Sequence, residues 1–172
     1  MNKKYQIFIS STYMDLKEER RAAIDAIFDT GNIPVGMEQF PASDLSQWEY
    51  IMKMLKDTDY VVLISAGRYG SLIKGDKVSW TEKEFNYAIE KGIPVLPIII
   101  KDIDELPVKK VDKYKERINE FHKKLKDDRT VSTYSNISEL KACVKDAIRN
   151  AIIDRPREGW VRATEVEKKR QQ

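Results

Sequence analysis

Short apolar runs alternate with amphipathic stretches along most of the chain. Between and after these runs, apolar residues recur at the three- and four-residue spacing of a helix with one buried face. The run at 60–65 is almost continuously apolar and β-branched, as in a strand covered on both faces. The alternation predicts an α/β fold with a parallel sheet between layers of helices. The predicted strands are residues 5–10, 33–37, 60–65, 93–100 and 131–134.

The order of the predicted elements also indicates the topology. For a doubly wound sheet of five strands we expect the flavodoxin-like order 2-1-3-4-5, with the first and third strands flanking the point where the strand order reverses. Composition changes after residue 154, where a linker containing Pro and Gly leads to a polar, helix-prone stretch. We therefore predict a three-layer domain over 1–154. Residues 155–172 would form a linker and the start of a C-terminal helix or coiled coil.

Charge and hydropathy exclude several classes of partner. The 31 basic and 28 acidic residues are interspersed and give a net charge of +3, which is too small to favour a nucleic-acid partner. The longest apolar run, 93–100, is far too short to cross a membrane. Residues 1–4 lead into the first strand without the features of a secretory leader. We expect a cytoplasmic protein with no membrane partner.

The scarcity of cysteine and histidine limits the available chemistry. Cys143 and His122 are the only residues of their kinds, so an internal disulfide cannot form, and we expect neither a zinc site nor a histidine-based triad. His122 lies among lysines in a helical stretch, where we expect a solvated side chain. We predict no metal site.

Two predicted loops meet where the strand order reverses, at residues 10–14 and 65–78. Glycines let a backbone approach phosphate, a guanidinium neutralises phosphate, and aromatic rings stack on a base. The loops therefore suit a nucleotide, although turn formation alone would also explain their glycines. Just beyond the first loop, Asp15 and Glu18 have capping-box spacing, so we expect Asp15 to begin a helix. The candidate ligand-binding residues of the two loops are Ser10, Ser11, Thr12, Tyr13, Arg68 and Tyr69.

The helix predicted over 79–91 carries two glutamates with different expected roles. Ser79 and Glu82 have capping-box spacing, which gives Glu82 a local structural role. Glu84 follows Trp80 by one helical turn and lies at the edge of the buried face, where we expect it to be half out of water. A carboxylate beside aromatic rings tends toward a raised pKa and can contact a ligand hydroxyl or a developing cation. The alternative is a solvated surface glutamate.

Several segments resemble the TIR-like domains grouped as domain of unknown function 4062, in the same order along the chain. The resemblance covers about residues 4–100. It implies a flavodoxin-like TIR fold. It also implies a place at the N-terminus of a multidomain bacterial protein, in antiphage defence or other signalling. The matching segments are KYQIFISST (4–12), DLKEER (15–20), MEQFPAS (37–43), DYVVLI (59–64), GRYGS (67–71) and TEKEF (81–85).

The resemblance also implies a chemistry. Many members of the wider TIR group cleave the nicotinamide–ribose bond of NAD with a glutamate on the third helix, commonly four residues after a tryptophan. Trp80 and Glu84 have this spacing. Glu84 would then be catalytic and Trp80 would contact the ligand, with NAD as substrate and no cofactor required. The chain departs from ordinary TIR domains at Thr81, where those domains carry a cysteine.

Two other functions stay open beside a NAD glycohydrolase or cyclase. The first is a catalytically inactive TIR-like module that acts through self-association or by recruiting a partner. The second, from the related fold of nucleoside deoxyribosyltransferases, is base exchange on nucleosides. Under the two TIR-like hypotheses we expect self-association and an effector or sensor domain C-terminal to this one.

Overall fold

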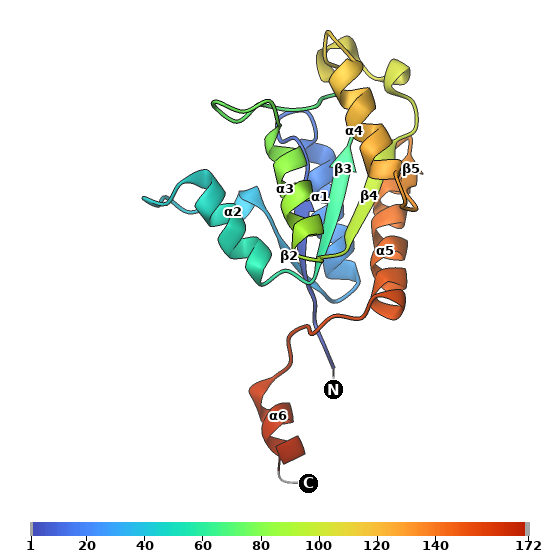
Figure 1. The fold of residues 1–172 in the computed structure, drawn as a ribbon. Coiled ribbons are helices and arrows are strands. Elements are labelled where there is room, and N and C mark those ends of the chain that lie inside the picture. The colour runs from blue at the N-terminus through green and yellow to red at the C-terminus, as the bar shows by residue number, and fades with distance from the viewer. Residues whose placement is uncertain (1, 171–172) are drawn as a thin grey trace.

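The computed structural model describes residues 2–170, and its centre is one parallel sheet. The strands lie side by side in the order β2-β1-β3-β4-β5, and each neighbouring pair is parallel. The predicted 2-1-3-4-5 order is therefore confirmed (Figure 1). The strands are β1 (Gln6–Ser10), β2 (Ile33–Val35), β3 (Tyr60–Ser65), β4 (Val95–Ile100) and β5 (Ser132–Tyr134).

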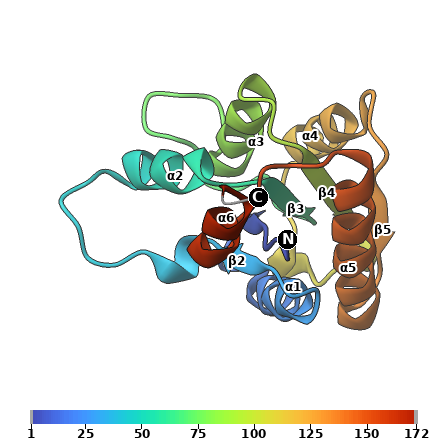
Figure 2. The same cartoon turned by 90° about the horizontal axis from the view of Figure 1, so that it is seen from below.

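Helices cover both faces of the sheet, as expected for a doubly wound fold (Figures 1 and 2). The helices α1 (Lys17–Asp29) and α5 (Ile137–Asp154) pack against each other on one face. The other face is covered by α2 (Gln47–Lys56), α3 (Trp80–Glu90) and α4 (Glu116–Lys126). Short 3-10 turns occupy Met37–Gln39, Ile103–Glu105 and Val108–Lys110.

The two cores follow from the alternation of side chains along each strand. In β3, Val62 and Ile64 face the helices α1 and α5, whereas Val61 and Leu63 face the opposite layer. All four are buried, and each such side chain contributes roughly 1.5–3 kcal/mol relative to exposure. The central strand therefore ties both helical layers to the sheet. Across residues 2–170, no helix combines the length and the apolar character needed to span a bilayer.

The capping-box spacing predicted the start of α3 correctly but not the start of α1. At α3, Ser79 Oγ accepts a hydrogen bond from the Glu82 N–H at 3.2 Å, as its spacing predicts. At α1 the prediction was wrong. Leu16 occupies the N-cap position without any side-chain capping bond, and the helix begins at Lys17. Leu16 is 2% exposed, so its burial in the core fixes how the chain enters the helix and leaves Asp15 outside it.

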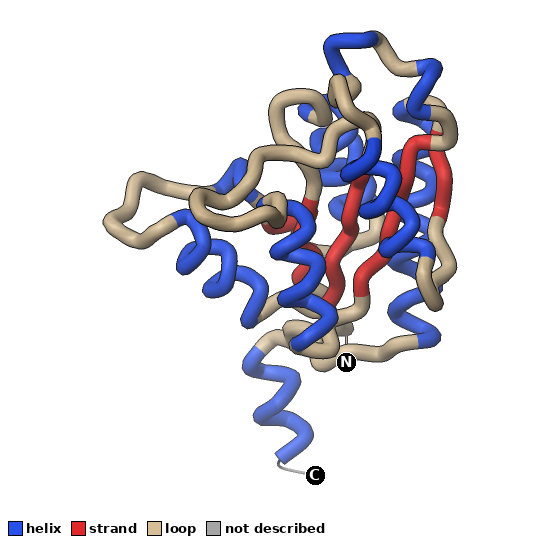
Figure 3. Tube along the Cα trace, turned by 45° about the horizontal axis from the view of Figure 1, so that its top comes forward, coloured by secondary structure: helices blue, strands red, loops and turns tan. Residues whose placement is uncertain are grey.

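The linker after α5 returns to the N-terminal edge of the sheet before the chain leaves the domain. Trp160 and Lys4 form an antiparallel bridge with two backbone hydrogen bonds of 2.7 and 2.9 Å. The carboxylate of Asp59 accepts from the Gly159 N–H at 3.1 Å and from the Gln6 N–H at 2.9 Å. The helix α6 (Ala163–Arg170) then projects from the domain (Figure 3). The predicted C-terminal helical extension is thus present as far as Arg170, and residues 171–172 lie outside the described part of the chain.

Asp59 holds the linker and β1 together, so we expect Asp59→Ala to loosen both. Hydrogen bonds to a charged group contribute about 1.5–3 kcal/mol each, and because Asp59 accepts two of them we expect a loss of about 3 kcal/mol in the free energy of unfolding. Tryptic cleavage after Arg157 and Arg162 should also become faster. Urea denaturation and limited proteolysis measure the two effects. The exposed neighbour Asp57, replaced by alanine, is the control, and equal cleavage rates in both variants would contradict the assignment.

Candidate functional site

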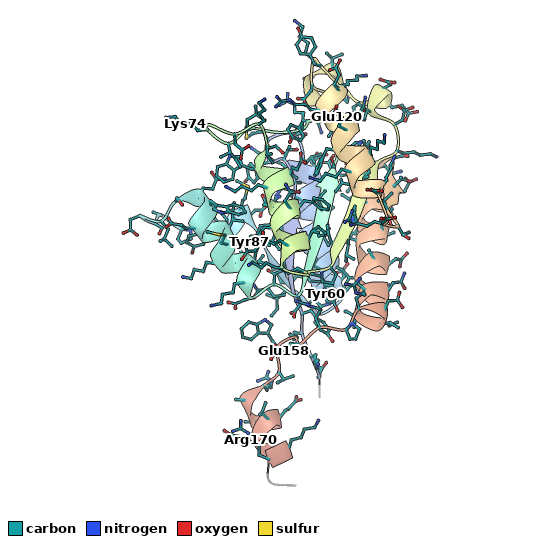
Figure 4. All side chains as sticks on the ribbon, viewed as in Figure 1. Tyr60, Lys74, Tyr87, Glu120, Glu158 and Arg170 are labelled. Carbon is teal, nitrogen blue, oxygen red and sulfur yellow. The ribbon has the colours of Figure 1, made fainter. Side chains whose placement is uncertain are left out.

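A cavity of about 400 Å³ lies at the carboxyl ends of β1 and β3, where the strand order reverses. Open parallel sheets bind ligands at this position. Its wall combines the β1–α1 loop, the β3–α3 loop, whose tip carries Lys74 in Figure 4, and the first turns of α3. The lining residues are Ser11, Thr12, Tyr13, Met14, Asp15, Met37, Gln47, Arg68, Gly70, Ser71, Trp80, Thr81, Glu84 and Asp112.

A larger cavity, of about 590 Å³, lies under the linker at the opposite edge of the sheet. It is lined by residues 56–59 and 156–161. Its carboxylate Asp59 is already occupied by two backbone N–H groups. We therefore place the candidate site at the carboxyl edge, where side chains with free polar groups gather.

The structure brings most of the predicted site residues into one wall and leaves two outside it. Ser11, Thr12, Tyr13, Arg68, Trp80 and Glu84 all line the cavity. Ser10 and Tyr69 are not part of this lining. Ser10 is completely buried at the end of β1.

Tyr69 has a structural role at the start of α3. Its hydroxyl donates to the Glu82 carboxylate and accepts from the Ser79 N–H at 3.2 Å. Its ring packs edge-on against Phe121, with ring centres 6.0 Å apart. Tyr69 thus supports the helix that carries Glu84 and lies away from the cavity.

Glu84 is buried more deeply than its position on the helix predicts. We expected a half-exposed carboxyl, but Glu84 is only 3% exposed. The reason is that α3 turns Glu84 toward the end of β1, where the two loops cover it. Burial raises its pKa to about 8, although the nearby Ser10 hydroxyl and the Arg20 charge oppose this effect. Neither group makes a hydrogen bond of ordinary geometry to the carboxyl.

Arg20 organises the β1–α1 loop from beneath. It is 1% exposed, and its guanidinium donates to Ser11 Oγ at 2.9 Å and to the Ile9 carbonyl at 3.3 Å. The same group forms a bidentate pair with Glu38, at 2.5 and 3.0 Å. A side chain at Gly36 would place its Cβ 2.8 Å from the guanidinium, so glycine leaves room for this pair. Arg20 therefore fixes a loop that lines the cavity.

Several lining residues were not predicted from the sequence. Asp112 reaches the wall from the segment after the third 3-10 turn, and it accepts from the Tyr69 N–H at 2.7 Å. No local pattern marks it, because its position depends on long-range packing. Thr81 could have been found from its place beside Trp80. Asp15 was assigned to helix capping, which hid its position in the wall.

His122 lies in a different environment from the one expected. It is 7% exposed, and its Nε2 lies 2.9 Å from Ser65 Oγ. The solvated side chain that we predicted is therefore wrong, because α4 packs this face of the helix onto the sheet. Burial lowers the pKa of His122 to about 4, so the ring is neutral at physiological pH. Over the described part of the chain, no group of three acidic, histidine or cysteine side chains is arranged to hold a metal ion.

Comparison with solved structures finds similar folds at low sequence identity. The TIR domains of the activated Roq1 resistosome, which directly recognises the pathogen effector XopQ, share 14% identity with a TM-score of 0.47. That match covers 85% of this chain and 84% of the other. A mutant flavo di-iron protein from Thermotoga maritima shares 15% identity with a TM-score of 0.47, over 88% of this chain and 37% of the other.

Comparison of sequences assigns the family. No curated protein matches the chain. The family model described as "Domain of unknown function (DUF4062)" matches residues 6–149. This region includes the whole sheet and every residue that lines the cavity. The chain therefore belongs to the DUF4062 family, as its sequence motifs predicted.

Proposed function

We propose that this domain binds NAD in the cavity and cleaves the nicotinamide–ribose bond, with Glu84 as the catalytic residue. The observation that carries the proposal is a buried carboxyl in the wall of a cavity at the switch point of the sheet. Trp80 lies in the same wall and offers a ring for stacking on nicotinamide. Arg68 offers a positive charge for a phosphate.

The chemistry requires little more than a placed negative charge. As the bond from C1′ to the nicotinamide nitrogen breaks, its electrons return to the ring and nicotinamide leaves neutral. Positive charge then develops on the ribosyl carbon, and the Glu84 carboxylate would stabilise it. A water molecule completes hydrolysis to ADP-ribose and releases a proton, whereas an internal attack by the adenine ring would give a cyclic product. The cationic ring also favours the charged form of Glu84 when NAD binds.

Nicotinamide release from NAD tests the proposal directly. The wild-type protein at high concentration should release nicotinamide, and Glu84→Ala should reduce the rate by at least about 10²-fold, as expected for loss of an electrostatic catalytic group. Glu90→Ala, on the exposed side of the same helix, should keep the wild-type rate. An intact NAD pool after prolonged incubation with concentrated wild-type protein would rule out the hydrolase.

A second candidate function is a non-catalytic module that works by self-association. The helix α6 favours this function, because it projects from the domain and has no buried residue. Such a helix would continue into an effector or sensor domain of a bacterial defence or signalling protein. The two functions are compatible. The absence of NAD cleavage together with concentration-dependent assembly would favour the module alone.

A further inference from the structure

The wall of the cavity contains a carboxyl group that the protein itself does not use. Asp15 is 9% exposed, and its Oδ2 is buried without a hydrogen-bond partner among the described residues. It does not cap α1, where the N-cap position belongs to Leu16. Thr12 Oγ1, in the same loop, is also buried and unpartnered. An unpaired buried polar group is costly, so this loop holds acceptors suited to a ligand.

The charges around Asp15 restrict what that ligand can present. The lining holds the carboxyl groups of Asp15, Glu84 and Asp112 and one guanidinium, that of Arg68. Asp112 already accepts from the Tyr69 N–H, and Arg68 donates to the Lys109 carbonyl. A phosphate beside Asp15 would be repelled, whereas a pair of hydroxyl groups would supply the missing donors. The side chains around this end of the cavity therefore suit a sugar better than an anion.

We propose that Asp15, together with Thr12, accepts hydrogen bonds from the vicinal 2′- and 3′-hydroxyls of the ligand's adenosine ribose, the sugar that carries the 2′-phosphate in NADP. This inference rests on the proposed function, which identifies the cavity as a nucleotide site. It assigns to Asp15 the selection of the sugar. A carboxylate has two oxygens and can accept from both hydroxyls at once. Asp15 would thus select ribosyl ligands over ligands with a 2′-phosphate or without the 2′-hydroxyl.

Binding of an uncleavable ribosyl ligand tests this selection independently of catalysis. We would titrate the full chain with ADP-ribose and with its 2′-phosphorylated form by calorimetry. The wild-type protein should bind ADP-ribose at least about tenfold more tightly than the 2′-phosphate. Asp15→Asn should weaken ADP-ribose binding by at least about tenfold and reduce the difference in affinity between ADP-ribose and its 2′-phosphorylated form. Asp25→Asn, on the exposed side of α1, should leave the affinities for both ligands unchanged. Circular dichroism would verify that both variants fold.

The outcomes separate this inference from the hydrolase. If ADP-ribose binds in an Asp15-dependent manner while NAD stays intact, Asp15 retains its role and the hydrolase fails. If NAD is cleaved and Asp15→Asn leaves KM and the preference for NAD over NADP unchanged, the hydrolase stands and the role of Asp15 is overturned. Failure of ADP-ribose to bind the wild-type protein at millimolar concentration also overturns it.

Discussion

Glu84→Gln is expected to make the domain more stable at neutral and alkaline pH while removing NAD cleavage. The folded-state pKa of Glu84 is about 8, against an ordinary value of 4.5. Between these pH values the folded protein binds a proton that the unfolded chain has lost, so stability falls as pH rises from 4.5 and levels off above 8. Glutamine is neutral throughout. At pH 7 we therefore expect the variant to gain on the order of 3 kcal/mol.

Urea denaturation of the wild-type protein and the variant at pH 5, 7 and 8.5 measures this gain. The difference in the free energy of unfolding should be small at pH 5 and should widen toward pH 8.5. Glu90→Gln is the matched control, because its carboxyl is 72% exposed on the same helix. If the difference in the free energy of unfolding between the two proteins stays constant with pH, Glu84 is charged in the folded protein at no cost in stability.

A gain in stability together with a loss of NAD cleavage would distinguish a functional carboxyl from a structural one. A structural carboxyl is paired, and its removal lowers stability. Within residues 2–170, Glu84 forms no salt bridge, and the nearby Ser10 hydroxyl and Arg20 charge offset only part of the cost of its burial. Groups that reduce stability are concentrated at catalytic sites, where their altered pKa serves the reaction. Higher stability with lost activity is therefore the signature that we expect.

Much of the fold could be predicted from the sequence because the signals are local and repeated. The run at 60–65 coincides with β3, where every residue is buried. Alternation of strands and helices predicts a parallel sheet, and the strand order follows from the few topologies that such a sheet permits. The cavity at the ends of β1 and β3 was predictable as well, because open parallel sheets bind ligands where the strand order reverses.

The site itself was less predictable, because helical periodicity does not fix how a helix is turned against its neighbours. Glu84 and His122 were both expected to contact solvent, and both are buried. Asp15 shows a different difficulty. Its capping-box spacing competes with the burial of Leu16, and burial decides where the helix begins. Arg20 and Asp112 act through partners distant in sequence, which no local pattern reveals.

Arg20→Met is expected to destabilise the domain and to disorganise the cavity from beneath. The substitution removes the donors to Ser11 Oγ and the Ile9 carbonyl, and it leaves Glu38 without its partner. Breaking a fully buried ion pair costs about 3–5 kcal/mol, but the Glu38 side chain is 28% exposed and can be hydrated, so we expect about 3 kcal/mol. Urea denaturation measures this loss. Because the positive charge of Arg20 lowers the pKa of Glu84, its removal should also raise that pKa further.

Three further variants separate the contributions of Arg20. Arg20→Lys keeps the charge but not the bidentate geometry, so it should lose less stability than methionine and leave the pKa of Glu84 nearly unchanged. Arg21→Met, on the exposed side of α1, should stay within about 0.5 kcal/mol of the wild type. In a double-mutant cycle with Glu38→Gln, a coupling energy near zero would contradict the ion pair as the main contribution. A coupling of at least about 1 kcal/mol would instead show that the Arg20–Glu38 pair stabilises the layer on which the cavity wall rests, in addition to the bonds that Arg20 donates to the loop.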